Sequence, residues 1–165
     1  MEYNEKSIQS KYMLVPRTLV FIRDEDKYLF IHKKKKDSFG FEKLNGIGGH
    51  IEKGEEPYES ARREIFEETR LVVENLSLVA IVIIDIGIIP GILMFVFSAK
   101  YSKGSPISSE EGDLLWIHKD EIPGMQNIVK DVPFLIDVIE KNCNGQNPKF
   151  IKYLYDENEE LRIVI

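Results

Sequence analysis

The sequence predicts a single α/β domain in which helices cover a mixed β-sheet, an α/β/α sandwich. Its 165 residues suit one domain that buries about 70% of its unfolded surface. Segments rich in β-branched and aromatic residues recur along the chain. Helical spacing of apolar residues is confined to 57–69 and 130–142. Neither a repeat nor a linker indicates a second domain within residues 1–165.

The first strands are expected ahead of the first helix. Residues 12–21 and 27–32 have strand composition and flank a charged turn at 23–26. They follow a polar arm at 1–11, and a short strand is expected near Leu44 within a glycine-containing loop.

The first helix is expected over residues 57–69. Pro57 suits its first turn, where the missing N–H group has no cost. Tyr58, Ala61 and Ile65 recur at helical spacing, and we expect them to form the buried stripe opposite the carboxylates described below.

The second half of the chain predicts more strands, one helix and a closing hairpin. The helix over 130–142 is indicated by the spacing of Val132, Leu135, Ile136 and Ile139. A polar loop is expected at 102–113. The strands are expected at 72–85, 92–101, 114–118, 149–155 and 161–165, the last two flanking a polar turn.

One apolar stretch, residues 76–97, is long enough to suggest a membrane span. Asp85 lies near its centre, and Gly87, Pro90 and Gly91 interrupt it. Two buried strands joined by a turn fit this composition better. We therefore expect no membrane interaction.

Composition restricts the partners and the compartment. The 22 basic and 28 acidic residues give a net charge of −6, which argues against a nucleic-acid polymer as partner. The net negative charge is compatible with a nucleotide as partner, because a bound divalent cation can reverse the negative potential at its site. The single cysteine, Cys143, excludes an internal disulfide, and the N-terminus lacks an apolar signal segment, so a cytoplasmic location is expected.

The most informative segment is 49–71, with the sequence GHIEKGEEPYESARREIFEETRL. Glu64, Glu67 and Glu68 stand at i, i+3 and i+4, so their carboxylates share one helix face and repel by about 0.2–0.5 kcal/mol per exposed pair. A solvated glutamate-rich face is the simple alternative. A hard cation such as Mg²⁺, which also binds substrate phosphates, would compensate the repulsion.

This segment resembles the Nudix box, G-x5-E-x7-R-E-U-x-E-E-x-G-U with U apolar. A chance match of six polar or glycine identities occurs in on the order of one in 10⁷ windows. Arg70 departs from the pattern, since the family has glycine there in a left-handed conformation, which costs arginine on the order of 1 kcal/mol. The matching positions are Gly49, Glu55, Arg63, Glu64, Ile65, Glu67, Glu68 and Leu71.

The resemblance implies the Nudix fold and cleavage of a diphosphate linkage by water attack on phosphorus. It also implies that Arg63 orients the carboxylates, pairing with Glu67 or with Glu55; an ordinary surface salt bridge is the alternative. The implied cofactor is Mg²⁺, with Mn²⁺ as a substitute. Its implied ligands are the carboxylates of Glu64, Glu67 and Glu68 and the carbonyl oxygen of Gly49.

Two further residues are candidates outside the box. Glu111 is the candidate general base, since related enzymes bring a glutamate from the loop before strand 114–118 to the metals; a solvated loop acid is the alternative. Lys33, in the basic run 33–36 at a strand end, is the candidate for phosphate contact, against the default of a solvated run.

Residues 45–49, NGIGG, resemble the corresponding segment of oxidised-purine nucleoside triphosphatases of the 8-oxo-dGTP diphosphatase type. That resemblance implies substrate contacts from Asn45, Asp131 and the aromatic Phe39. Turn formation is the alternative for Asn45, and helix N-terminal capping is the alternative for Asp131.

Two departures bear on base specificity. Ile128 stands where those enzymes tend to have a base-stacking tryptophan, and Lys130 replaces the first acid of an acidic pair. The apolar turn 86–92 could line the base pocket or form a homodimer surface.

The favoured hypothesis is a Mg²⁺-dependent pyrophosphohydrolase that converts nucleoside triphosphates, such as 8-oxo-dGTP, to monophosphate and pyrophosphate. One alternative is hydrolysis of ADP-ribose or a dinucleotide polyphosphate. The proline and tyrosine typical of those enzymes are replaced by Asp85 and Ile88. A non-catalytic nucleotide-binding module is the other alternative, although such modules usually lose box carboxylates.

Overall fold

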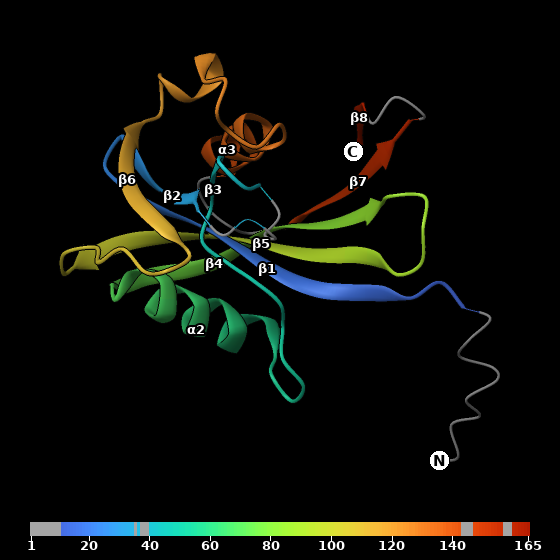
Figure 1. Ribbon diagram of the computed structural model, residues 1–165, viewed down its shortest axis with the longest axis horizontal. Helices are drawn as coiled ribbons and strands as arrows, with labels where there is room; N and C mark the ends of the chain where they lie inside the picture. Colours follow the sequence, from blue (N-terminus) through green and yellow to red (C-terminus); the bar gives the residue numbers. More distant parts are fainter. Residues whose placement is uncertain (1–10, 35, 37–39, 143–146, 157–159) are drawn as a thin grey trace.

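The computed structural model describes residues 11–34, 36, 40–142, 147–156 and 160–165. In this described part of the chain, one eight-stranded sheet forms the middle layer, and two α-helices lie on its opposite sides (Figure 1). The helices are α2 (Pro57–Thr69) and α3 (Val132–Lys141), with a short 3₁₀ helix, η1 (Ile122–Gly124), before α3. The strands are β1 (Leu14–Asp24), β2 (Lys27–Lys33), β3 (Leu44–Asn45), β4 (Val72–Asp85), β5 (Gly91–Lys103), β6 (Gly112–His118), β7 (Lys149–Tyr155) and β8 (Leu161–Val164).

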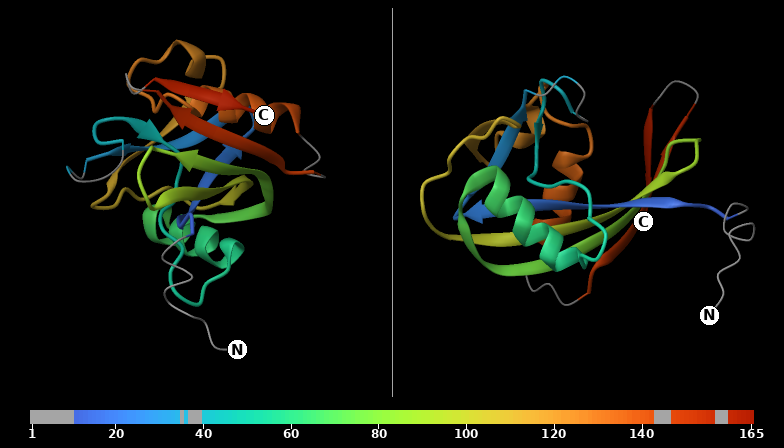
Figure 2. Two further views of the ribbon diagram at one scale, coloured as in Figure 1. Left: turned by 90° about the vertical axis from the view of Figure 1, so that its right-hand side faces the viewer. Right: turned by 60° about the horizontal axis from the view of Figure 1, so that its bottom comes forward.

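The sheet is mixed, as the sequence predicted. Its order is β3-β2-β1-β5-β4-β7-β8, and β6 also pairs with β2. Strand β1 runs parallel to β5, and β4 runs parallel to β7, whereas the other pairs are antiparallel. The α/β/α sandwich is thereby confirmed, and Figure 2 shows α2 lying across one face of the sheet.

Both faces of the sheet are covered by a hydrophobic core. Side chains alternate along β1, so Leu19 and Phe21 belong to the core that also contains α3, while Val20 and Ile22 belong to the core under α2. The chain therefore needs consecutive apolar residues in its central strands rather than strict alternation of apolar and polar residues.

The apolar stretch 76–97 forms most of β4 and β5, which pair with each other antiparallel. Within the described part of the chain, no helix is long and apolar enough to cross a membrane. The turn between the strands leaves Ile88 and Ile89 65% and 62% exposed.

Most element boundaries agree with the predicted ones or differ by one or two residues, whereas β1 ends at Asp24, three residues later than predicted. The prediction that Tyr58 belongs to the buried stripe is wrong: it is 37% exposed, and its ring packs edge-on against Phe97. The predicted buried stripe also omits Glu68, which α2 buries together with Ala61 and Ile65. Phe39, Cys143 and most of the N-terminal arm lie outside the described residues.

Candidate active site

Local capping signals fix where α2 begins and ends. Glu56 accepts hydrogen bonds from the backbone N–H groups of Tyr58 and Glu59, and the Glu59 carboxylate accepts one from the Glu56 N–H group. At the other end Arg70 is left-handed with φ 59°, and its guanidinium lies 4.9 Å from the Phe66 ring centroid. Arginine thus adopts the glycine conformation expected from the box pattern, and the carboxylates keep their helical spacing.

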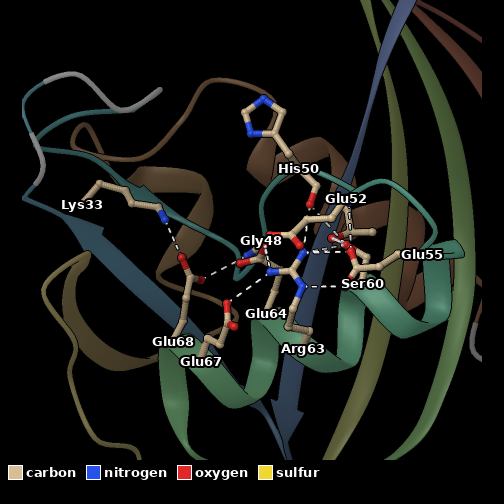
Figure 3. A network of polar contacts seen from close by, with 11 residues as sticks. Lys33, Gly48, His50, Glu52, Glu55, Ser60, Arg63, Glu64, Glu67 and Glu68 are labelled. Atoms are coloured by element: carbon tan, nitrogen blue, oxygen red, sulfur yellow. Dashed lines mark hydrogen bonds and ion pairs between the residues drawn. The ribbon is translucent and has the colours of Figure 1, made fainter.

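Arg63 connects the loop before α2 to the helix (Figure 3). Its Nε donates to Glu55 Oε1 at 2.6 Å, and one terminal nitrogen donates to Glu64 Oε1 at 2.8 Å and to Glu67 Oε2 at 3.1 Å. The other terminal nitrogen donates to the His50 carbonyl oxygen at 3.0 Å. The hydrogen bonds from Arg63 lower the pKa of Glu55 to about 2. Both predicted partners of Arg63 are therefore present together.

Glu68 lies deepest of the three carboxylates. Lys33 Nζ on β2 donates to Glu68 Oε1 at 2.7 Å, and both residues are buried. The other oxygen of Glu68 accepts the Gly48 N–H group at 3.1 Å. Burial raises the pKa of Glu68, while Lys33 and the backbone bond oppose the shift. The Lys33 amine, which was predicted to contact phosphate, is thus held by the Glu68 carboxylate on α2.

The Glu64 carboxylate packs against Gly49, the first residue of the box. A Cβ atom at Gly49 would overlap the Glu64 carboxylate, so only glycine allows this close approach. The Gly49 carbonyl oxygen accepts the Thr18 N–H group at 2.9 Å and keeps a second lone pair. Burial raises the pKa of Glu64, and Arg63 opposes the shift.

One cavity of about 1230 Å³ is lined both by the box carboxylates and by the residues predicted to contact the base. The box contributes Glu64, Glu67 and Glu68. Glu111, Asn45 and Asp131 line the same cavity, as do apolar side chains. The cavity brings together the predicted residues Lys33, Asn45, Gly49, Glu64, Glu67, Glu68, Glu111 and Asp131.

The two residues predicted to contact the base differ in how they are held. The Asn45 side-chain oxygen accepts the Gly46 N–H group at 2.8 Å, which is the turn-forming bond of the alternative hypothesis. Its amide nitrogen keeps two donors for other partners. Asp131 makes no side-chain cap on α3, so its alternative role as a helix cap is wrong. Burial raises the pKa of the Asp131 carboxyl group.

Several cavity residues were not predicted from the sequence. Arg17 Nε donates to His50 Nε2 at 3.1 Å, so a guanidinium on β1 lines the cavity near the box. Tyr153 on β7 also lines the cavity. Neither residue belongs to a local motif, and only the strand pairing brings them to the site. Ile128 packs in the core instead of lining the cavity, whereas Lys130 lines it.

The sequence model of the NUDIX domain matches residues 13–134, which include the whole box and most of the sheet. The chain belongs to the Nudix hydrolase family. The Nudix box in this chain therefore lies within a longer match to the NUDIX domain and is not an isolated motif.

Known Nudix proteins include close relatives in sequence and structure. The chain is 34% identical over 107 residues to the oxidized purine nucleoside triphosphate hydrolase of Mus musculus, covering 64% of this chain and 67% of that protein. It is 31% identical over 125 residues to the Danio rerio protein of the same name, covering 75% and 79%. The mutator MutT protein of Bacillus halodurans superimposes with a TM-score of 0.71 at 26% identity, covering 91% of this chain and 97% of that one.

Nudix hydrolases in general use divalent metals, and the donor chemistry of this box fits such an ion. The cavity offers carboxylate and carbonyl oxygens, the ligands that Mg²⁺ and Mn²⁺ prefer. Glu67 is 56% exposed at its side chain and accessible to an incoming ion. Among the described residues, no three acidic, histidine or cysteine side chains stand in a ligating arrangement. Arg63 and Lys33 form ion pairs with the box carboxylates. Metal binding here stays a prediction.

Proposed function

We propose that this Nudix hydrolase converts purine nucleoside triphosphates, oxidised ones such as 8-oxo-dGTP included, to the nucleoside monophosphate and pyrophosphate in a Mg²⁺-dependent reaction. The observation that carries the proposal is the single cavity that connects the box carboxylates to Asn45 and Asp131. Phosphates can lie at the box while a base lies against the amide and the carboxyl group. The names of the Mus musculus and Danio rerio relatives support the same substrate class.

The box end of the cavity supplies the groups for phosphoryl chemistry. The proposed ligands of Mg²⁺ are Glu64, Glu67, Glu68 and the Gly49 carbonyl oxygen, and the ion when bound would neutralise phosphate charge and lower the pKa of the attacking water. Arg63 holds two of these carboxylates at 2.8 and 3.1 Å and thereby orients them.

Three side chains complete the proposed chemistry. Glu111 lines the cavity and accepts the proton of the attacking water. The new bond joins the water oxygen to phosphorus, the bond that breaks is the anhydride linkage between α- and β-phosphate, and pyrophosphate leaves. Arg17 and Lys33, two of the cations that line the cavity, offset the charge of the triphosphate.

Asn45 and Asp131, which line the same cavity, offer hydrogen-bonding groups for the edge of a nucleobase. Asn45 is buried, and its amide nitrogen can donate to a base acceptor. The Asp131 carboxyl group also lines the cavity, and burial raises its pKa. An amide and a carboxyl group together discriminate a purine edge by its pattern of donors and acceptors.

The test is a release assay for pyrophosphate and phosphate with Mg²⁺ across dGTP, 8-oxo-dGTP, 2-oxo-dATP, ADP-ribose and diadenosine polyphosphates. Glu67→Gln, which removes one ligand charge, serves as the inactive control. Pyrophosphate release from the purine triphosphates supports the proposal. Turnover of ADP-ribose or a dinucleotide alone would contradict the substrate assignment while leaving the metal assignment intact.

A further inference from the structure

Tyr153, in the middle of β7, has a buried hydroxyl group without a hydrogen-bond partner. The residue is 1% exposed, and its oxygen is the single buried side-chain polar atom in the described part of the chain that lacks such a partner. Buried tyrosine hydroxyl groups normally find a partner, because leaving one unpaired has a desolvation cost. An unpaired group of this kind suggests a missing ligand.

The strand pairing places this hydroxyl at the cavity. Tyr153 is paired with Ile84 on β4, and both residues line the cavity with Met94 of β5. Asp131 lies close enough to raise the pKa of Tyr153 through its charge and a hydrogen-bonding interaction, yet the hydroxyl group has no partner at ordinary hydrogen-bond distance and angle. Burial first, and then the neighbouring charge of Asp131, raise the pKa of Tyr153, so the phenol stays protonated and acts as a donor.

We propose that Tyr153 determines base specificity: its hydroxyl group donates a hydrogen bond to a carbonyl oxygen or ring nitrogen on the edge of the nucleobase, beside Asp131. This inference rests on the proposed function. Ile84 and Met94 provide apolar surface suited to the flat faces of a base. Tyr153 then adds a third polar contact to those of Asn45 and Asp131, at a position that a phenylalanine could fill without recognising any polar group.

The test compares Tyr153→Phe with the unmodified enzyme. One neutral hydrogen bond corresponds to about a 3- to 10-fold effect. We expect KM for the preferred purine triphosphate to rise by that factor while kcat is unchanged. Without metal, calorimetry should show the same loss in affinity for the nucleoside monophosphate. Inhibition by inorganic tripolyphosphate, which lacks a base, should not change.

Stability separates a recognition role from a structural one. Tyr153→Phe removes an unpaired polar atom, so the melting temperature should stay equal or rise. The matched control is Tyr28→Phe, at a buried tyrosine outside the cavity whose hydroxyl donates to Glu140 at 2.5 Å. That control should lower the melting temperature and leave KM unchanged.

The outcomes distinguish failure of the role of Tyr153 from failure of the proposed function. An unchanged KM and affinity in Tyr153→Phe, with the unmodified enzyme active on triphosphates, would overturn the role of Tyr153 and leave the proposed function standing. A fall in stability together with weaker binding of tripolyphosphate would show a structural role and also overturn it. If the unmodified enzyme hydrolyses no nucleoside triphosphate, the proposed function fails, and the role of Tyr153 fails with it.

Discussion

The buried pair of Lys33 and Glu68 allows a sharp test of how the site is held together. The Lys33→Met variant keeps the volume of the side chain and removes its charge. Glu68 is then left buried with the Gly48 N–H group as its remaining partner, at 3.1 Å. Removing one member of a buried ion pair costs about 3–5 kcal/mol, and the retained backbone bond places the expected loss near the lower end, about 3 kcal/mol.

The assay is urea unfolding of the metal-free protein at neutral pH, with thermal unfolding alongside. For a domain of this size, a loss of about 3 kcal/mol lowers the melting temperature by roughly 6–12 °C. The double variant Lys33→Met/Glu68→Gln is the control, because the neutral amide no longer leaves a charge buried. We expect it to recover most of the loss.

A Lys33→Met variant within about 1 kcal/mol of the unmodified protein would refute this reasoning, since surface ion pairs contribute about 0–1 kcal/mol. It would mean that Glu68 reaches water or another cation when Lys33 is removed. An equally unstable double variant would show that Lys33 acts through packing and not through its charge.

Four other predictions concern single residues. Glu67→Gln should lower kcat by more than about 100-fold with an unchanged melting temperature, because its side chain is 56% exposed; steady-state kinetics and calorimetry measure both. Gly49→Ala should lose activity in steady-state kinetics with little change in urea unfolding, because the methyl group would displace the Glu64 carboxylate, the end of a flexible side chain, from its place in the site. Asn45→Ala should raise KM or alter base preference with the metal dependence preserved, and an unchanged substrate profile would exclude a base contact. Glu55 has a pKa lowered to about 2, so its ionised form adds stability above pH of roughly 4–5 that is lost as the pH falls towards about 2; the stability difference between the protein and Glu55→Gln should shrink over that range.

The sequence predicted what local chemistry determines. The helix bounds at 57–69 agree with the structure because a capping box and Pro57 define the start within a few residues. The fold class followed from strand composition and from the order of strands and helices. Those signals are all contained in short windows of sequence.

Contacts between distant elements could not be predicted in this way. Lys33 and Glu68 are 35 residues apart, and only the position of α2 relative to β2 joins them. Tyr153 reaches the cavity because β7 pairs with β4 in parallel, which no local pattern indicates. Tyr58 has helical spacing typical of a buried residue, yet it lies at the margin of the helix–sheet interface, where its ring meets only part of the core.

The most direct test of the central claim is a crystal structure with 8-oxo-dGMP and Mn²⁺. The claim is that one cavity holds the phosphates at the box and the base at its other end. We predict the metal at Glu64, Glu67 and Glu68, and the base edge within hydrogen-bond distance of Asn45, Asp131 and the Tyr153 hydroxyl. A base bound elsewhere, with the metal still at the box, would contradict the assignment of the base site.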